Sequence, residues 1–359
     1  MIEYLELTKN LIQIPSVSSD QSAVLLCQDL IKNYLGRNFI CQKVKSGKYI
    51  SYILSEKKIK NFDVLFYAHL DVVPADKQSF IPKIKNNRLY GRGSLDMKSA
   101  AAIQSDILKN TNYKNLKIGL VLVPDEEIGG ENGFQKVLSA GFRAKLVIVP
   151  DGGMGKKIII SQKGVLFYKL TKKGKGGHGS RPWLAQNPIL ELIKVYQVLV
   201  KDLKINNKKV NQGITANLGK IIGGEKTNAI PYQAEITVDF RYSTKSQQNQ
   251  LEKYLSSLKN IKVEKIFKGE IFQISKNNNF LKKFQQITKV DFDWETGGSD
   301  ARFLTKYNIP AIIYQPRGDN HHSENEWVSI DSLAEFKEQL LKYLQYLDQH
   351  YEKFFKKNK

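Results

Sequence analysis

Cysteine is scarce in this sequence, and no hydrophobic run is long. Cys27 and Cys41 are the two cysteines among 359 residues, which does not suggest a disulfide framework. A membrane span needs ~20 consecutive apolar residues, and no run approaches that length. The first residues, MIEYLELTKNLIQIPS, lack the basic and apolar regions of a secretory signal. We therefore expect a cytoplasmic protein that does not enter a membrane.

Arginine is also scarce, although the chain is strongly basic. The net charge is +21, but only 8 of the 56 basic residues are arginine, and the 48 lysines are spread along the chain. Nucleic-acid surfaces commonly use arginine for bidentate contacts. The composition thus favours a lysine-rich surface that attracts anions weakly, and disfavours a specific nucleic-acid partner.

The first half of the chain alternates strand and helix patterns. Nearly continuous apolar runs at 62–69, 116–124 and 144–150 predict buried strands, and helices are expected at about 97–109 and 134–141. This order predicts an α/β fold with a mixed, mostly parallel sheet covered by helices. Functional sites in such folds form outside the carboxyl ends of the strands.

The pattern changes after residue 162. Segments from 163 to 273 follow the order βαββαβ, which is the ferredoxin-like motif. The chain then returns to an α/β pattern, with a helix expected to start at GGSDARF and a long amphipathic helix at the end. At 359 residues, two domains are expected. We predict a discontinuous catalytic domain, 1–162 with 274–359, and an inserted domain, 163–273.

Histidines and acids follow the predicted strands, at their ends or in later loops. Histidine together with carboxylates suits zinc or a similar divalent ion. Two histidines and several acids are enough to hold two such ions that share one carboxylate. Each residue also has an ordinary interpretation: a lone histidine as a satisfied polar group, Asp96 as a helix cap, and Asp151 as a turn residue. The set comprises His69, Asp71, Asp96, Glu126, Glu127, Asp151 and His322.

Eight short strings carry a family resemblance across nearly the whole chain. In order they are HLDVVP, YGRGSLDMKSA, PDEEIGG, PDGG, GKGGHGSRP, TNAIP, GGSDARF and HHSENE. Together they resemble the dizinc metallopeptidase and deacylase family, which includes aminoacylase, carnosinase-type dipeptidases, glutamate carboxypeptidase and succinyl-diaminopimelate desuccinylase. The resemblance implies a homodimer with two Zn²⁺ per chain, for which Co²⁺ or Mn²⁺ are possible substitutes. It also implies that the inserted domain serves as a lid and in dimerisation.

The resemblance implies a ligand role for five residues. His69 and Asp151 match the ligands of one metal, and Asp96 matches the carboxylate that bridges both metals. Glu127 and His322 match the ligands of the second metal, because the last ligand of the family stands four residues before a glutamate, here Glu326. The adjacent His321 remains the alternative. The peptide bond after the bridging aspartate is often cis in this family.

The neighbours of the ligands are implied to carry the chemistry. Glu126 matches the general base, which takes a proton from the attacking water and passes it to the departing amine. Asp71 is implied to orient the ring of His69 through a hydrogen bond from a ring N–H. Asp125, the first of the three consecutive acids, is expected to have a structural role in the turn.

Further implied residues concern the substrate. His178 matches a histidine that stabilises the oxyanion, often from the partner subunit. Asn228 and Arg241 match positions that hold substrate carbonyl or carboxylate groups; Arg241 is alternatively a surface residue of a strand. Gly298 and Ser299 are expected to line the pocket at a helix N-terminus.

Three departures from the desuccinylase pattern bear on the substrate. Asp151 stands where deacylases commonly have glutamate, and SQKGVLF replaces a paired-arginine string. In GHGSRPW, the residues after His178 are not the Ala-Tyr-Pro string that desuccinylases usually have there. These departures favour hydrolysis of small peptides, as by a dipeptidase or aminopeptidase. The alternative is an N-acyl amino acid deacylase, such as succinyl-diaminopimelate desuccinylase or acetylornithine deacetylase. A non-catalytic binding protein of the same fold is disfavoured, because every expected metal and base position is filled.

Overall fold

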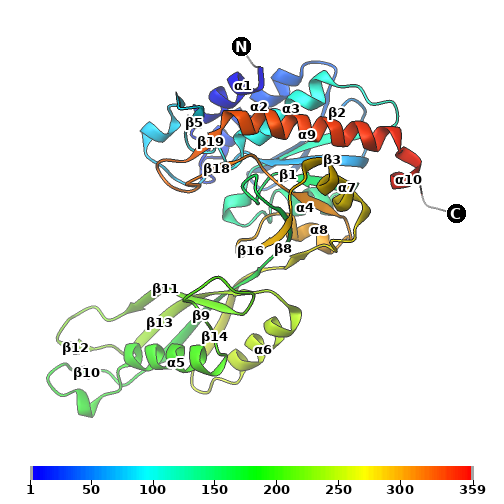
Figure 1. Cartoon of the computed structure of the whole chain (residues 1–359). Coiled ribbons are helices and arrows are strands. Elements are labelled where there is room, and N and C mark those ends of the chain that lie inside the picture. Colours follow the sequence, from blue (N-terminus) through cyan, green and yellow to red (C-terminus); the bar gives the residue numbers. More distant parts are fainter. Residues whose placement is uncertain (1–2, 357–359) are drawn as a thin grey trace. The chain divides into compact units, whose positions relative to one another are not determined.

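The computed structural model describes residues 3–356, which divide into two compact units (Figure 1). The first unit comprises 1–161, 273–295 and 299–359, and the second comprises 162–272 with 296–298. Each unit has its own sheet and is described separately below.

A nine-stranded mixed sheet forms the centre of the first unit. Its order is β1-β2-β6-β3-β7-β17-β8-β15, with β16 paired to β8. The four middle strands run parallel to one another, whereas β1, β2 and β8 pair antiparallel. The strands are β1 (Ile40–Ser46), β2 (Tyr49–Ser55), β3 (Asn61–His69), β6 (Ile118–Val123), β7 (Arg143–Val149), β8 (Ile158–Gln162), β15 (Phe272–Gln273), β16 (Phe292–Glu295) and β17 (Ala311–Ile313). The expected α/β fold with a largely parallel sheet is confirmed.

Helices cover this sheet and continue its core. Helix α3 packs on β3 and β6 and contacts α1, α2 and α9, whereas α4 packs against β1 (Figure 1). The strands under α3 are mostly apolar, and Val64, Phe66, Val121 and Leu122 are fully buried, as expected of strands covered on both faces. The helices are α1 (Glu3–Ile12), α2 (Gln21–Leu35), α3 (Lys98–Asn110), α4 (Phe134–Ser139), α7 (Asn279–Thr288), α8 (Arg302–Thr305), α9 (Ile330–Gln349) and α10 (Tyr351–Phe355).

Short elements complete the first unit. A small antiparallel sheet has the order β18-β19-β5-β4 and was not expected from the sequence. Its strands are β4 (Lys83–Lys85), β5 (Arg88–Tyr90), β18 (Gly318–Asp319) and β19 (Trp327–Ser329), and two 3₁₀ turns are η1 (Lys77–Phe80) and η2 (Glu126–Ile128).

The second unit has the predicted βαββαβ order. Its antiparallel sheet has the order β11-β13-β9-β14, and α5 packs on β9, β11 and β13. A two-stranded sheet, β10 with β12, is added where the chain leaves β9. The elements are β9 (Gly164–Lys173), β10 (Gly177–His178), η3 (Pro182–Leu184), α5 (Pro188–Asp202), β11 (Thr215–Gly223), β12 (Ala229–Ile230), β13 (Gln233–Tyr242), α6 (Lys245–Ser256) and β14 (Lys262–Gly269).

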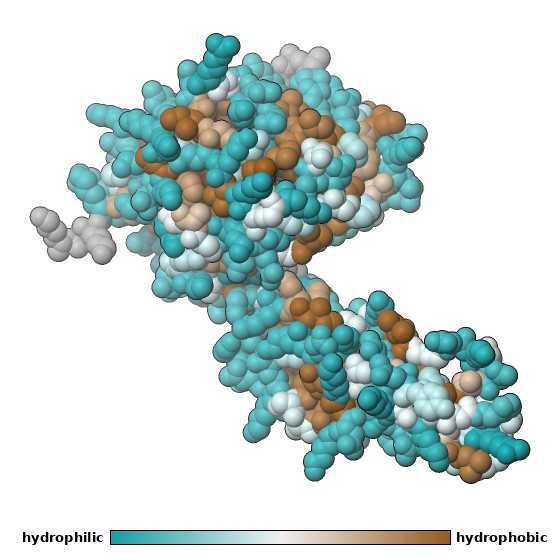
Figure 2. Space-filling view, turned by 180° about the vertical axis from the view of Figure 1, so that it is seen from behind, coloured by the Kyte–Doolittle hydropathy of each residue, from teal (hydrophilic) through white to brown (hydrophobic). Residues whose placement is uncertain are grey.

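The surface seen in Figure 2 is mainly hydrophilic, with hydrophobic residues scattered among polar ones. Cys27 and Cys41 are both free thiols. Within residues 3–356, no helix is both long enough and apolar enough to cross a membrane.

Candidate metal centre and active site

His69 is the last residue of β3, and its ring is fully buried. Nδ1 lies 3.0 Å from the main-chain oxygen of Asp71, whereas the nearest carboxylate oxygen of Asp71 is 3.6 Å away. The ring is thus oriented chiefly by the carbonyl of Asp71 rather than by its carboxylate. Because a carbonyl only accepts, Nδ1 carries a proton. Nε2 then faces Asp96 Oδ1 at 2.9 Å.

Asp96 stands in the loop between β5 and α3, and the Asp96–Met97 peptide bond is cis, as the resemblance implied. Glu326 holds this loop in place. Its carboxylate accepts hydrogen bonds from the main-chain N–H groups of Gly93, Leu95 and Asp96 at 2.9–3.1 Å. Arg92 donates to the same carboxylate at 2.7 Å, and both side chains of this ion pair are almost completely buried.

Glu126 and Glu127 begin the 3₁₀ turn η2 that follows β6. The buried carboxylate of Asp71 accepts their main-chain N–H groups at 3.1 and 3.2 Å, and Ser18 Oγ donates to it at 2.7 Å. One side chain, brought in from the end of β3, therefore fixes the backbone that carries both glutamates.

His322 meets Asp96 and Glu127. Its Nε2 lies 3.1 Å from Asp96 Oδ2 and 3.1 Å from Glu127 Oε2. The residue has φ 62°, in the left-handed region where histidine is enriched among non-glycine residues. Of the two adjacent histidines, His322 is thus the one placed against these carboxylates.

Asp151 follows β7 and lies close to His69 and Glu126. One donor atom each from His69, Glu126 and Asp151 lie within 4.8 Å of one another, and so do donor atoms of His69, Asp96 and Glu127. The loop after Asp151 is held by Gln315, which accepts the Gly152 N–H at 2.8 Å. The structure therefore places Glu126, the expected base, beside a ligand candidate of the first metal.

The electrostatics of the cluster are those of crowded, buried acids. Burial and the charge of Asp151 raise the pKa of Glu126 well above its ordinary value. Burial and the charge of Asp96 raise the pKa of Asp151. Hydrogen bonds to Asp96 and Glu127 raise the pKa of His322 to about 10. Protonation alone is a poor means of neutralising the negative charge of so many neighbouring carboxylates.

The donor set fits divalent cations. Nε2 of His69 presents a lone pair to a carboxylate oxygen when Nδ1 holds the proton. Asp151 Oδ2 is buried, and no hydrogen-bond partner is found for it among the described residues. Imidazole nitrogens with carboxylate oxygens are the donors that zinc and similar ions prefer.

Asp125 has a different environment from its two neighbours. It is buried, and its Oδ2 accepts the Asn132 N–H at 2.7 Å. The main-chain oxygen of Asp125 accepts the Gly130 N–H at 2.7 Å. Asp125 therefore closes the turn after the glutamates, which is the structural role expected of it.

In the second unit, His178 and Asn228 lie side by side. His178 in β10 pairs with Ala229 in β12, and the Gly179 N–H donates to the main-chain oxygen of Asn228 at 2.7 Å. Both residues are exposed.

Arg241 lies at the opposite end of the unit. It pairs with Val165 at the start of β9, whereas His178 follows the end of that strand. A ten-residue strand spans about 33 Å. The guanidinium of Arg241 makes two bonds to Asp239, at 2.8 and 2.9 Å, so it is already paired with a carboxylate.

Lys163 is a residue that the sequence analysis did not select. Its side chain is 2% exposed, and Nζ donates to the carbonyl of Gly213 at 2.7 Å. Burial and the nearby charge of Arg241 lower the pKa of Lys163. Two cationic side chains thus stand close together at this end of the second unit. The one signal in the sequence is that Lys163 belongs to SQKGVLF, the string that stands where desuccinylases usually have paired arginines.

Gly298 and Ser299 stand just ahead of a short helix. The expected helix at GGSDARF is the single four-residue turn α8, which begins at Arg302. Gly298 belongs to the second unit, whereas Ser299 belongs to the first unit and is fully buried. The chain turns at Asp300 and Ala301 before α8 starts, and the main-chain oxygen of Ser299 accepts the Arg302 N–H at 3.2 Å. That these two residues line the substrate pocket stays a prediction.

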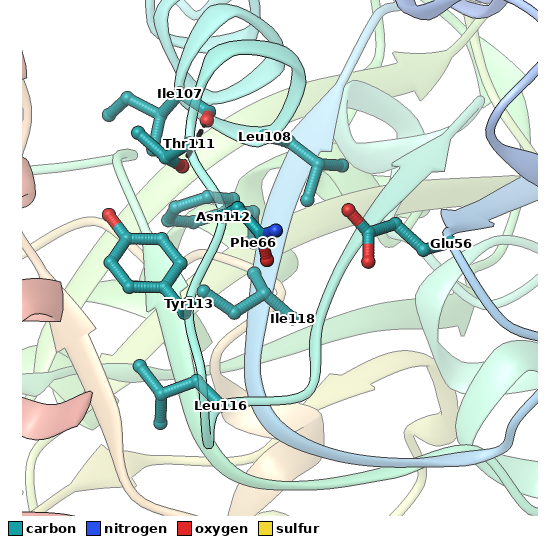
Figure 3. A pocket seen from close by; sticks show the side chains of 9 residues that line it. All are labelled: Glu56, Phe66, Ile107, Leu108, Thr111, Asn112, Tyr113, Leu116 and Ile118. Atoms are coloured by element: carbon teal, nitrogen blue, oxygen red, sulfur yellow. Dashed lines mark hydrogen bonds between the residues drawn. The ribbon is translucent and has the colours of Figure 1, made fainter.

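A small cavity lies away from the cluster in the first unit. Phe66, Ile107, Leu108 and Ile118 line it with polar groups from Glu56 and Thr111 (Figure 3). Its volume of about 30 Å³ admits only molecules the size of water. It is too small for a peptide or an acylated amino acid.

His69 ends a parallel strand, Glu126, Glu127 and Asp151 follow such strands, and Asp96 and His322 meet them from loops. Such a set of histidines and carboxylates is typical of metal-dependent hydrolases. The chain belongs to Peptidase family M20/M25/M40, whose model matches residues 65–346. The resemblance stated from the sequence is confirmed.

Two relatives match the chain over nearly their full length. The chain is 32% identical to a succinyl-diaminopimelate desuccinylase of Pelagibacter ubique, over 91% of this chain and 94% of the relative. It is 27% identical to a succinyl-diaminopimelate desuccinylase of Coxiella burnetii, over 97% of this chain and 100% of the relative. These similarities favour the deacylase alternative over the dipeptidase interpretation.

Solved structures share the fold at low sequence identity. A tripeptidase from Staphylococcus aureus has a TM-score of 0.78 at 18% identity, covering 97% of this chain and 98% of that one. A metallo-carboxypeptidase of the same family from Sulfolobus solfataricus has a TM-score of 0.76 at 18% identity, with coverages of 97% and 100%. The structural similarity establishes the fold, but at sequence identities this low it does not indicate the substrate.

Proposed function

We propose that the protein hydrolyses the amide bond of N-acyl amino acids, with an N-succinyl amino acid as the preferred substrate. The observation that carries this proposal is the placement of two adjacent glutamates by Asp71. Glu127 lies against His322, and Glu126 lies near His69 and Asp151. The full-length similarity to desuccinylases supports the choice of acyl group.

We propose that the cluster holds two divalent cations, zinc by preference, with cobalt or manganese as substitutes. His69 and Asp151 would hold one ion, Glu127 and His322 the other, and Asp96 would bridge them. Its two carboxylate oxygens face different histidines, Oδ1 toward His69 and Oδ2 toward His322. When bound, such ions lower the pKa of water and polarise the substrate carbonyl.

Glu126 is proposed as the general base. As the water oxygen attacks the amide carbon, the carboxylate of Glu126 accepts the water proton. It then delivers this proton to the amide nitrogen as the C–N bond breaks, which releases a carboxylic acid and a free amine. Asp71 serves this step by fixing the backbone N–H of Glu126.

His178 is proposed to stabilise the oxyanion in the site of a second copy of the chain. The second unit begins at Gln162 and contains both Arg241 and His178, but β9 separates them by its full length. We propose that in a dimer His178 of one chain acts on the substrate held by the metal cluster of the other. Exposed Leu190 and Val198 on α5, and Ile221 and Ile222 on the edge strand β11, supply an apolar surface for such a partner. We propose that the inserted unit serves as lid and dimerisation domain of a cytoplasmic enzyme.

The free carboxylate of the substrate is proposed to bind near Lys163 and Arg241. Lys163 donates a hydrogen bond to the neutral carbonyl of Gly213, so a bound anion would balance its charge. Asn228, Gly298 and Ser299 remain proposed contacts of the substrate, as implied by the family.

Hydrolysis of dipeptides is the second candidate. Asp151, rather than glutamate, stands after β7, which resembles the dipeptidase and aminopeptidase branch of the family.

A substrate panel separates the two candidates. The purified protein with added zinc is incubated with N-succinyl-diaminopimelate, N-acetyl amino acids and dipeptides, and release of free amine is measured. We expect the highest kcat/KM for the N-succinyl substrate. A higher kcat/KM for dipeptides would transfer the assignment to the second candidate, and no hydrolysis of any of them would refute both.

A further inference from the structure

The ring of His178 makes two contacts with the residue two positions later. Its Nδ1 lies 2.8 Å from Ser180 Oγ and 3.2 Å from the main-chain nitrogen of Ser180. The main-chain N–H points at the ring nitrogen with hydrogen-bonding geometry. Both contacts therefore involve the same nitrogen of the imidazole.

A backbone N–H can only donate a hydrogen bond. The nitrogen that receives it must present a lone pair, so Nδ1 carries no proton in this arrangement. In a neutral imidazole the proton then resides on Nε2. The hydroxyl of Ser180, which can donate or accept, adapts by donating to the same nitrogen.

The backbone around the histidine keeps this N–H in place. The Arg181 N–H donates to the carbonyl of His178 at 3.0 Å, which closes a turn over residues 178–181. The Gly179 N–H donates a hydrogen bond to the main-chain oxygen of Asn228. A Cβ at Gly179 would stand 3.0 Å from main-chain atoms of Asn228. Glycine at this position therefore allows the segments around residues 179 and 228 to approach closely.

We propose that Ser180 is a positioning residue that selects the Nε2–H tautomer of His178. The inference rests on the proposed role of His178 and deepens it. An oxyanion needs a hydrogen-bond donor, and with Nδ1 occupied as an acceptor the free edge of the ring presents Nε2–H. Were Nδ1 the protonated nitrogen, the free edge would offer a lone pair and repel the oxyanion. Asn228 acts with Ser180 by holding the turn.

The tautomer is measured directly by NMR of the full-length, zinc-supplemented protein labelled with ¹⁵N-histidine. Long-range ¹H–¹⁵N correlations distinguish protonated from bare ring nitrogens, and a His178→Asn spectrum identifies the signals of His178. We expect a bare Nδ1 and a protonated Nε2 at a pH where the ring is neutral. A protonated Nδ1 in the wild-type protein would overturn the proposal.

Kinetics of Ser180 variants give a second readout. Ser180→Ala keeps the main-chain N–H but loses the hydroxyl, and is expected to lower kcat about fivefold with KM little changed, the size of one hydrogen bond. Ser180→Thr restores the hydroxyl and is expected to restore kcat. Ser256→Ala, which removes an exposed hydroxyl bonded to the Lys253 carbonyl, is the control. A full loss of activity in Ser180→Thr, or an unchanged kcat in Ser180→Ala, contradicts a positioning role of the Ser180 hydroxyl.

Failure of this inference is distinguishable from failure of the proposed function. If His178→Ala retains wild-type turnover, the catalytic role of His178 is wrong whatever its tautomer. If His178→Ala loses turnover but Nδ1 is protonated in the wild type, the role of Ser180 alone is wrong.

Discussion

The carboxylate of Glu326 accepts the main-chain N–H of Asp96 at 3.1 Å, although 230 residues separate them. The same carboxylate binds the N–H groups of Gly93 and Leu95 and the guanidinium of Arg92. Glu326 also follows His322 by four residues, so it connects the loop of one candidate ligand to the loop of another. The spacing between Asp96 and His322 therefore depends on this buried contact.

Replacing Glu326 by glutamine should destabilise the protein even without metal. The amide places N–H groups where the carboxylate now accepts, and leaves Arg92 buried without its counter-charge. Breaking a buried pair costs about 3–5 kcal/mol, measurable as a fall in the free energy of unfolding in urea. Glu335→Gln, which removes the half-exposed partner of Arg317, is the control and should cost less than about 1 kcal/mol. Equal effects of the two substitutions would show that Glu326 has no special role.

Asp71→Asn should impair turnover more than it impairs metal binding. Its carboxylate fixes the N–H groups of both glutamates, so the amide leaves Glu126 in a shifted position. We expect kcat to fall about 10–100-fold, with zinc content measured by elemental analysis little changed. Asp20→Asn, which alters an exposed helix cap, is the matched control. An Asp71→Asn enzyme within twofold of wild type would refute the positioning role.

The strands and the polar residues at their ends were predictable from the sequence. The apolar runs ending at His69 and Val123 have the length and composition of buried strands, and their polar ends mark the site. Other features were not predictable, because they depend on contacts between distant segments. The strands β4 and β18 have three and two residues and little apolar character. Glu326 was noted only for its spacing from His322, and its role as acceptor for three N–H groups follows from the fold alone.

Glu126→Gln should retain metal and fold but lose most of its turnover. The amide cannot accept the proton of the attacking water, and general-base catalysis contributes about 10²–10⁴-fold. The measurement is kcat for the N-succinyl substrate together with zinc content. Glu131→Gln, an exposed acid of the following turn, should behave as wild type. A Glu126→Gln rate within a few-fold of wild type would assign the base to another group.

Mixing two inactive variants tests the proposed dimer. His178→Ala and Glu126→Gln chains, unfolded together and refolded in equal amounts, should regain about a quarter of wild-type activity if subunits pair at random. In each mixed dimer, one site combines an intact Glu126 with the intact His178 of the other chain. Each variant refolded alone is the control. No gain on mixing, with mixed dimers present, would place both residues in the site of one chain.

Titration of zinc into the metal-free protein tests the central claim most directly. Hydrolysis of N-succinyl-diaminopimelate is followed as zinc is added, with bound zinc measured in the same samples. Activity is predicted to be absent in the chelated protein and to rise to its maximum as two equivalents bind, in wild type but not in Glu126→Gln. Full activity of the metal-free protein, or activity unaffected by the loss of Glu126, would contradict the account.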